Sequence, residues 1–487
     1  MTSYDSSSSG AADAPASPAS SAPAQDNPKR AVPVLLGLFV FSLIVDSAFR
    51  FTSKPIADDL GLSVTTVSLQ TTLAGIIIGV GAVVYATLAD SISMRKILLA
   101  AIAMICAGSL IGFAFRENWS MILTGRIIQT SGLAAAETLY VIYVTKYLSK
   151  EDRRTYLGFS TSAFQLAMLV GILTTGYIST YISWSVLFLV PLLSVLAVPS
   201  VLKTVPDHQL SGSRLDVFGI VLIAALATNV MLFLQNFNWW FMVPVVISIA
   251  LLWWHISSHT NVLVDRAFFA DRRYVSMLLV VFILYSVQLA YIFMFPFMVS
   301  ELYGISFDNI SLLTVPGYAC AVVVGALSGK IGERLSVRST ITLAMVLIVA
   351  SLLIPAVFVT TSVVPFVLSM VVFGSGFALM YAPLVATAIR EITPERSGVA
   401  IGFYNLTINV AVSVGIAYTA KLLDLKPSLF DGIVSTPDGF DPSFSNVLVI
   451  VAVVALLGLV VYRVASSLLA RADRAAGRPV ETAALDG

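Results

Sequence analysis

The chain has 487 residues, of which 58% are hydrophobic and 11% are charged, and its mean hydropathy is +0.92. This composition excludes a string of soluble domains, and the formal net charge of +1 gives no reason to expect a nucleic-acid partner. Apolar runs of about 20 residues, the length that crosses a bilayer, recur from Ala31 to Val464. We therefore predict an all-α polytopic membrane protein, with the lipid bilayer as its surroundings.

The apolar runs predict about fourteen membrane-spanning helices. In chain order they cover residues 32–52, 65–89, 96–115, 119–145, 155–179, 184–203, 216–236, 238–257, 274–300, 309–330, 337–357, 363–389, 397–421 and 445–466. Residues 1–30 precede the first run and are rich in Ser, Ala and Pro. Such a segment cannot bury enough apolar surface to fold, so we predict a disordered tail there.

Lysine and arginine side chains concentrate in one set of alternate loops. The opposite loops hold only Lys54, Arg116, Lys421 and Lys426. Because cytoplasmic loops of membrane proteins carry an excess of Lys and Arg, both termini are predicted to be cytoplasmic. An even number of spans requires the same arrangement. We expect a multi-pass protein of the cell (plasma) membrane.

Two short polar hairpins share one pattern: "DSISMR" at Asp90–Arg95 and "ERLSVR" at Glu333–Arg338, 243 positions apart. The same offset moves the start of the first apolar run to residue 274, where the ninth begins. This predicts two related six-helix bundles, at residues 31–203 and 274–466. Helices 7 and 8, with their flanking loops, form an insertion at 204–273, and residues 467–487 form a second cytoplasmic tail.

The arrangement resembles the major facilitator superfamily, in its fourteen-helix drug:proton antiporter branch, and within it the Gram-positive tetracycline-efflux and multidrug exporters. The segments that carry the resemblance are "YATLADSISMRKILL", "RIIQTSGLAAA", "YLSKEDRR", "SWSVLFLVP", "LVDRAFFADRRY" and "RSGVAIGFYNLT". It implies a proton-coupled secondary transporter that exports amphipathic small organic molecules by alternating access. The alternatives are a major facilitator importer or exporter of one metabolite and, from another class, a non-transporting membrane enzyme or receptor.

The resemblance also implies that the first hairpin is a cytoplasmic latch between the bundles. Asp90, Arg95 and Lys96 match the motif of that latch, and the repeat adds Glu333 and Arg338. A carboxylate at a helix end can cap the N-terminus of a neighbouring helix, and a rocking motion would break the contact.

Four ionisable residues lie within apolar runs: Asp46, Arg50, Arg126 and Glu137. Charges at such depth are costly, so each is a candidate functional residue. Asp46 and Arg50 are four apart and share a helix face. Counting the rise per residue from the outer ends places Asp46 about 9 Å deep and Arg126 about 10 Å deep, which permits a contact between them.

Proton coupling is assigned to Asp46 and Arg126, which match charged positions of the resembling family. Burial raises the proton affinity of a carboxylate and a nearby guanidinium lowers it, so a small movement can switch such a pair. Glu137 has no counterpart in the family pattern, and we interpret it as a determinant of substrate choice that favours cationic groups.

The expected substrate cavity combines aromatic, amide and charged side chains, a lining that suits an amphipathic organic molecule. Its candidates are Glu137, Arg50, Gln129, Tyr140, Gln165, Gln288, Tyr291, Tyr381, Asn405 and Asn409. For Gln165, Gln288, Tyr291, Tyr381, Asn405 and Asn409 the alternative is a hydrogen bond between helices. For Asp46, Arg50 and Arg126 the alternative is a set of static ion pairs between helices near the outer mouth.

The family pattern fails in two places. Ile172 stands where a proline is expected, Thr175 where a glycine is, and Met168 and Val412 replace acids of the tetracycline exporters. The tetracycline substrate is therefore not carried over. No phosphate-binding loop motif appears, so an ion gradient is the expected drive. We expect no cofactor, no metal site and a monomer that binds its small-molecule substrate and protons.

Overall fold

The computed structural model describes residues 28–207, 217–258, 271–359, 362–392, 394–431 and 442–475. This part of the chain is built from helices. Twelve helical runs within it are long and apolar enough to cross a membrane. Helices α6 and α8 contain shorter apolar stretches, Leu166–Tyr181 and Val221–Leu234. The all-α membrane fold is confirmed, whereas the count of fourteen spans stays a prediction.

The first six predicted spans form an N-terminal bundle. Its elements are η1 (Pro28–Arg30), α1 (Val32–Phe51), α2 (Ser53–Leu60), α3 (Val64–Ser91), α4 (Met94–Ala114), α5 (Trp119–Tyr147), α6 (Lys150–Tyr181), η2 (Trp184–Phe188), η3 (Val190–Ala197) and α7 (Val198–Thr204). Short polar turns separate these helices. Ser63, Asn118 and Ser149 cap the starts of α3, α5 and α6 by accepting hydrogen bonds from backbone amides of the first turn.

A helical pair follows, and then the C-terminal bundle. The pair consists of α8 (Val217–Asn236), η4 (Trp239–Phe241) and α9 (Met242–Ser258). The C-terminal bundle consists of α11 (Arg272–Tyr303), α12 (Phe307–Arg334), α13 (Val337–Phe358), α14 (Val364–Ile389), α15 (Pro394–Leu425) and α16 (Ser443–Ala475). Gly304, with a φ of +61°, ends α11 in the left-handed conformation that glycine adopts without strain.

Three predicted boundaries need correction. The sixth span is not one α-helix but η2, η3 and α7 in succession, and Pro191 and Pro199, which have no backbone N–H to donate, each stand in the first turn of the element they begin. Helix α16 continues to Ala475, nine residues past the predicted boundary at 466. Of the predicted first tail, Pro28–Arg30 form a short helix, and residues 1–27 lie outside the described part, as do residues 476–487.

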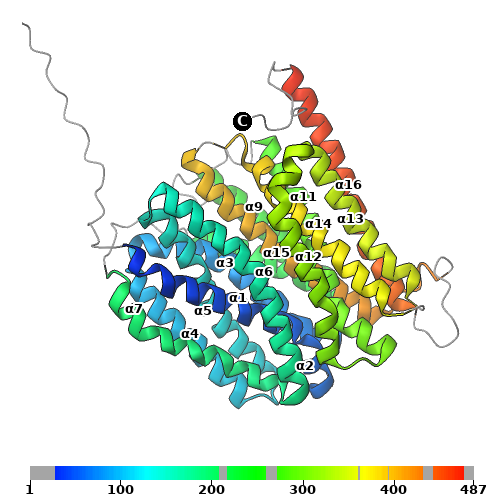
Figure 1. Ribbon diagram of the computed structural model, residues 1–487, viewed down its shortest axis with the longest axis horizontal. Coiled ribbons are helices and arrows are strands. Elements are labelled where there is room, and N and C mark those ends of the chain that lie inside the picture. Colours follow the sequence, from blue (N-terminus) through cyan, green and yellow to red (C-terminus); the bar gives the residue numbers. More distant parts are fainter. Residues whose placement is uncertain are drawn as a thin grey trace, which may run out of the picture.

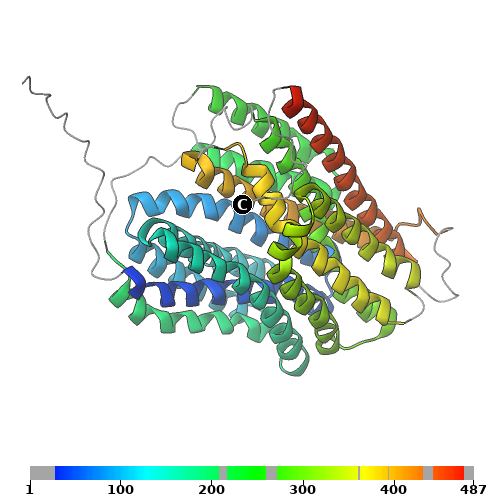
Figure 2. The same cartoon turned by 45° about the horizontal axis from the view of Figure 1, so that its top comes forward.

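The two bundles meet at one end and diverge toward the other. In Figure 1 they come together at the lower right, near α2 and the start of α12, and separate toward the upper left. In the turned view of Figure 2 the helices of the N-terminal bundle, blue to teal, lie beside those of the C-terminal bundle, green to red. Two helix pairs form most of the junction between the bundles, α3 with α15 and α6 with α12, and α11 adds smaller contacts with α1 and α2. The joined end is the one that the sequence predicts to be extracellular, and we call it the outer end.

Small residues allow close packing where the bundles meet. A Cβ added to Gly75 of α3 would lie 2.4 Å from Ser413 Oγ of α15, and one added to Gly176 of α6 would lie 2.1 Å from Ser311 Oγ of α12. Helix α8 packs on both α3 and α15, where Met231 and Ala227 are buried with Ile76.

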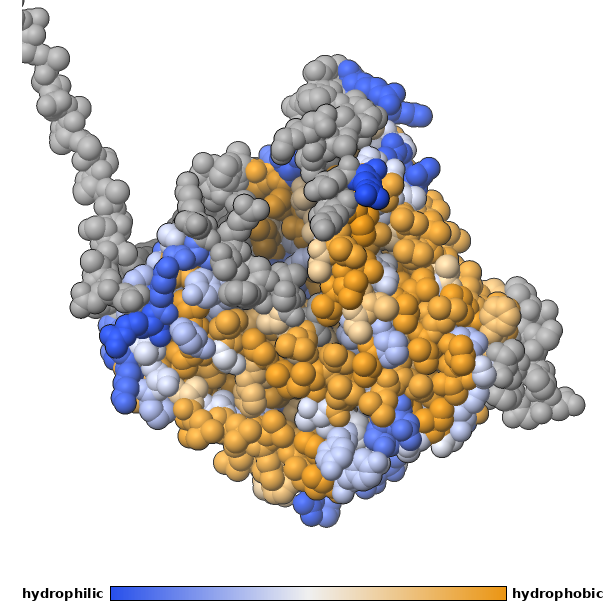
Figure 3. Space-filling model, viewed as in Figure 1, coloured by the Kyte–Doolittle hydropathy of each residue, from blue (hydrophilic) through white to orange (hydrophobic). Residues whose placement is uncertain are grey.

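The surface pattern fits a bilayer. Apolar side chains cover the middle of the molecule, and hydrophilic ones gather at its ends (Figure 3). Large hydrophobic side chains are exposed around this band, as on α9, where Val246 is 61% exposed. Such exposure is expected for helices that face lipid rather than water.

Candidate functional site

An ion pair within α1 forms the centre of the site. Arg50 Nε lies 2.5 Å from Asp46 Oδ2, across one helical turn. The Asp46 side chain is buried, and that of Arg50 is nearly so. The spacing of four residues brings the two groups together on one face of the helix.

Arg126 of α5 approaches the same carboxylate from the neighbouring helix. Its Nη2 lies 4.0 Å from Asp46 Oδ1, and its side chain is only 1% exposed. Nε donates a hydrogen bond of 3.3 Å to Gln70 Oε1, and Nη1 donates to Gln129 Oε1. The guanidinium also lies over the Phe49 ring, 4.0 Å from its centroid, which is cation–π geometry.

Amide side chains hold the guanidinium in place. Gln70 Nε2 donates to the Phe49 carbonyl at 2.8 Å, so its Oε1 is turned toward Arg126. Gln129 Nε2 donates to Ser109 Oγ at 2.8 Å, which directs its Oε1 in the same way. Sequence reasoning missed Gln70, although an amide inside the apolar run 65–89 is a signal that could have found it.

Three buried polar atoms of this cluster have no hydrogen-bond partner among the described residues: Asp46 Oδ1, Arg126 Nη2 and Glu137 Oε1. The distance of 4.0 Å between the first two is an electrostatic contact but too long for a hydrogen bond. Glu137 of α5 is half-buried and within electrostatic range of Asp46 and Arg50. Unsatisfied buried groups are costly, so this arrangement can accept a proton or a polar ligand group.

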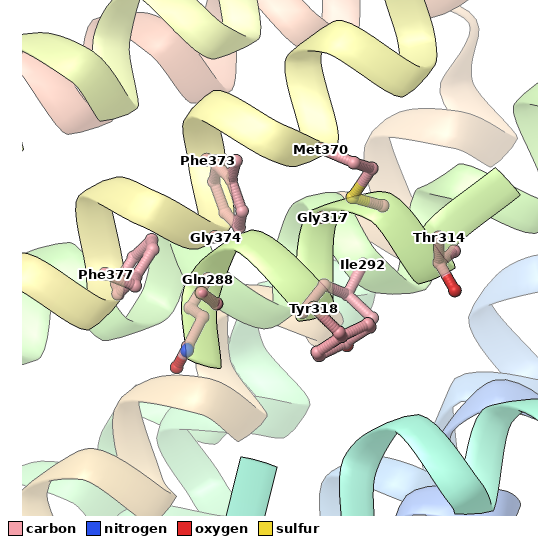
Figure 4. Close-up of a pocket in the computed structure, with 10 residues that line it drawn as sticks. Gln288, Ile292, Thr314, Gly317, Tyr318, Met370, Phe373, Gly374 and Phe377 are labelled. Atoms are coloured by element: carbon pink, nitrogen blue, oxygen red, sulfur yellow. The ribbon is translucent and has the colours of Figure 1, made fainter. Parts of the chain in front are cut away.

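A second element of the site is a pocket in the C-terminal bundle (Figure 4). Its lining is Gln288, Ile292, Thr314, Gly317, Tyr318, Ala321, Met370, Phe373, Gly374 and Phe377. These residues come from α11, α12 and α14. The wall is aromatic and aliphatic with three polar groups, a composition that suits an amphipathic molecule, although the volume of about 40 Å³ in this conformation is too small to hold one.

Tyr318 connects this pocket to the charged cluster. Its buried hydroxyl finds no hydrogen-bond partner in the described part of the chain and lies within electrostatic range of Arg50. The pocket of one bundle therefore faces the ion cluster of the other. Sequence reasoning named Gln288 but missed Tyr318, Phe373 and Phe377, because an aromatic residue in an apolar helix gives no signal that separates a pocket from a core.

Several predicted cavity residues make contacts within their own bundle. Tyr140 is fully buried, stacks on Phe39 at 4.8 Å and donates to the Tyr156 carbonyl at 2.7 Å. Tyr291 is also fully buried, and its hydroxyl lies 2.8 Å from Ser369 Oγ. Their expected role in substrate contact stays a prediction. In this conformation both hydroxyls form bonds between helices, which was the alternative for Tyr291.

The remaining cavity candidates lie closer to the surface. Tyr381 is 40% exposed. Asn405 is exposed, and Asn409 donates from Nδ2 to the Asn405 carbonyl at 3.0 Å. A Cβ added to Gly79 of α3 would lie 3.0 Å from Asn409 Cβ, so Asn409 lies at the junction of the bundles. The side chain of Gln165 lies outside the described residues.

The described residues of the predicted cytoplasmic latch contact their own bundle. Arg95 Nε donates to the Val205 carbonyl at 2.8 Å, and Arg338 Nη2 donates to Ser467 Oγ at 3.0 Å. Lys96 is exposed. The side chains of Asp90 and Glu333 lie outside the described residues, so the latch stays a prediction.

An ion pair fastens the predicted cytoplasmic end of the N-terminal bundle. Lys29 Nζ lies 3.0 Å from Asp152 Oδ1, and this contact, with the hydroxyl of Ser149, lowers the pKa of the Asp152 carboxyl. Tyr143 donates to the Pro28 carbonyl at 2.9 Å. The chain that enters α1 is thereby joined to α5 and α6.

Comparison with solved structures shows a shared fold. A POT family peptide transporter in an auto-inhibited form superposes with a TM-score of 0.68 over 90% of this chain and 97% of that chain, at 14% identity. The nucleoside transporter NupG gives a TM-score of 0.62 over 90% and 98% of the two chains, at 12% identity.

Sequence comparison finds curated relatives and a family. The chain is 25% identical to the putative multidrug resistance protein MdtD of Enterobacter sp. (strain 638), over 80% of this chain and 85% of the relative. It is 23% identical to MdtD of Yersinia enterocolitica, over 76% and 81%. The Major Facilitator Superfamily matches residues 35–416 and, in a second match, residues 277–483. The chain belongs to the Major Facilitator Superfamily and is a secondary transporter, not an enzyme.

Proposed function

We propose that this protein exports amphipathic small organic molecules in exchange for protons, as a monomer in the plasma membrane with both termini in the cytoplasm. The names of the MdtD relatives support drug export, and the distribution of Lys and Arg supports the orientation. The observation that carries the proposal is the contact between Asp46 and Arg126, two buried charges on different helices whose facing atoms form no hydrogen bond with any described residue.

The Asp46 carboxylate is the proton carrier in this proposal. Arg50 and Arg126 both lie against this carboxylate. Because Arg126 stands on α5 and Asp46 on α1, a shift between these helices changes their separation. Movement of the guanidinium away from the carboxylate favours uptake of a proton, and its return favours release.

The substrate binds between the charged cluster and the aromatic pocket. Phe373, Phe377 and Met370 offer an apolar surface, while Gln288 and Tyr318 offer hydrogen bonds. The Glu137 side chain, on the opposite bundle, has an oxygen that no described residue satisfies, and it favours a cationic group on the substrate. The bundles are joined at the outer end, so this conformation is the inward-facing one, ready to load from the cytoplasm.

Proteoliposomes test the proposal. The purified protein is reconstituted, a pH gradient is imposed, and movement of fluorescent amphipathic cations is followed together with internal pH. We expect substrate to move against its gradient while protons move the opposite way, and ionophores that collapse the gradient to stop it. Movement of substrate and protons in the same direction, or transport that ignores the pH gradient, would refute antiport.

A further inference from the structure

The N-terminus of α3 is capped by a residue of the other bundle. Asp424, near the end of α15, accepts hydrogen bonds from the backbone amides of Val64 at 3.1 Å and Thr65 at 2.9 Å. The next amide, of Thr66, is satisfied locally by Ser63 Oγ at 3.1 Å. The first amides of a helix have no partner inside it and carry partial positive charge, so a carboxylate stabilises them.

The N-terminus of α12 has a corresponding contact. The side chain of its N-cap, Ser306, accepts no bond from a backbone amide of the first turn, and the Asp308 amide instead donates to Thr180 Oγ1 of α6 at 3.1 Å. The Tyr181 hydroxyl of α6 donates to Asp308 Oδ2 at 2.8 Å. Here too, side chains at the end of a helix in one bundle form hydrogen bonds with the first turn of a helix in the other.

The two contacts are related by the internal repeat. The offset of 243 that connects the two hairpins takes Thr65 to Asp308 and Tyr181 to Asp424. The same pair of positions therefore joins the bundles twice, once on each side of the outer end. The acid occupies opposite positions in the two contacts: Asp424 is at the end of α15, whereas Asp308 is in the first turn of α12.

Both contacts close the outer end, and both must break before it can open. The rings of Phe51 in α1 and Phe307 in α12, with centroids 5.2 Å apart, add an apolar contact beside them. We propose that the pairs Asp424–α3 and Tyr181–Asp308 form a twofold outer latch that stabilises the inward-facing conformation. This inference takes the two-bundle fold and the orientation of the proposed function, and it depends on neither the substrate nor the coupling ion.

The two contacts of the outer latch, which we call its arms, are expected to differ in strength. Asp424 offers both oxygens to two amides at a positive helix end, a charge-assisted arrangement. The other arm has one bond from a phenol to Asp308 and one neutral bond to Thr180. Loss of Asp424 is therefore expected to open the outer end more than loss of the Tyr181 hydroxyl.

Distance measurements between spin labels test the latch. Cys106 and Cys320 are replaced by Ala, and cysteines for labelling are placed at Glu117 and Val364, exposed positions at the outer ends of the two bundles. In the full chain in nanodiscs, we expect Asp424→Ala to raise the ratio of long to short distances about fivefold, the effect of losing a typical helix cap. Tyr181→Phe should raise it less, and the double variant most.

Two further variants separate the latch from general damage. Asp58→Ala removes an exposed acid at the same end that pairs with Lys54 inside α2, so it should leave the distances unchanged. Asp424→Asn keeps one acceptor oxygen without the charge and should give an intermediate ratio. If both Asp424→Ala and Tyr181→Phe keep the wild-type distances, or Asp58→Ala shifts them equally, the inference is wrong, whatever the export assay shows.

Discussion

The two bundles share a fold but differ in what they bury. In the N-terminal bundle Asp46 and Arg126 are buried. The repeat offset takes these positions to Leu289 and Ser369 in the C-terminal bundle. It takes Arg50 to Phe293 and Glu137 to Met380, both buried.

This difference assigns separate tasks to the two halves. The charged groups of the site belong to one bundle, where Gln70 and Gln129 hold the guanidinium. The other bundle offers aromatic and thioether surface, with Phe373, Phe377 and Met370 around the pocket. Under the proposed function, the N-terminal bundle carries proton coupling and the C-terminal bundle contacts the substrate.

The largest expected effect on transport comes from replacing Asp46, the buried acid of the N-terminal bundle. Asp46→Asn cannot exchange a proton, so pH-gradient-driven transport should be abolished. Substrate counterflow without a gradient should persist because the fold and the pocket remain. Proteoliposome assays of both activities check this, and undiminished gradient-driven transport in the variant would end the assignment of Asp46.

Arg126 gives the next effect. Arg126→Leu leaves Gln70 and Gln129 without their buried partner, and loss of one member of a buried pair costs about 3 kcal/mol. We expect a lower thermal midpoint and no proton coupling. Arg126→Lys keeps the charge but cannot bond both amides at once, so it should couple at a reduced rate. If Arg126→Leu and Arg126→Lys showed the same proton coupling, the positive charge at position 126 would have no part in it.

A smaller effect on transport is expected from changes in the pocket of the C-terminal bundle. Phe373→Leu removes a ring from the pocket and should raise KM for aromatic substrates about threefold to tenfold, with proton coupling intact. The matched control is Phe366→Leu on the same helix, where the ring packs on Phe295 and Tyr303 outside the pocket. A change in KM that is equal in both variants would indicate general loosening of the bundle.

The smallest effect is selective. Glu137→Gln removes the ionisable carboxyl from the cluster and should weaken competition by cationic substrates severalfold, while neutral substrates keep their KM. Inhibition of transport by matched cationic and neutral compounds measures this. A parallel change for both classes would place Glu137 in the structure of α5 and not in substrate choice.

The sequence predicted more of the candidate site in the N-terminal bundle than in the C-terminal bundle. Charges in an apolar run are conspicuous, so Asp46 and Arg126 could be named and their depths matched before any coordinates. Aromatic pocket residues such as Phe373 look like ordinary membrane core. The outer latch was also out of reach, because Asp424 and Thr65 are 359 positions apart and the contact is to a backbone amide.

Periodicity also has limits at helix ends. The runs predicted where helices lie, because burial in lipid demands continuous apolar length. They could not show that the sixth span divides into η2, η3 and α7, since its apolar run continues across Pro191 and Pro199.

Because of the position of α8, the two seams between the bundles differ in how they are covered on the lipid-facing side. By packing on both α3 and α15, this helix screens one seam between the bundles from the acyl chains. Within the described ranges, the α8–α9 pair does not cover the opposite seam, between α6 and α12, in the same way. A hydrophobic solute dissolved in the bilayer therefore meets two different flanks: one seam lies behind α8, and the other is formed by α6 and α12 themselves.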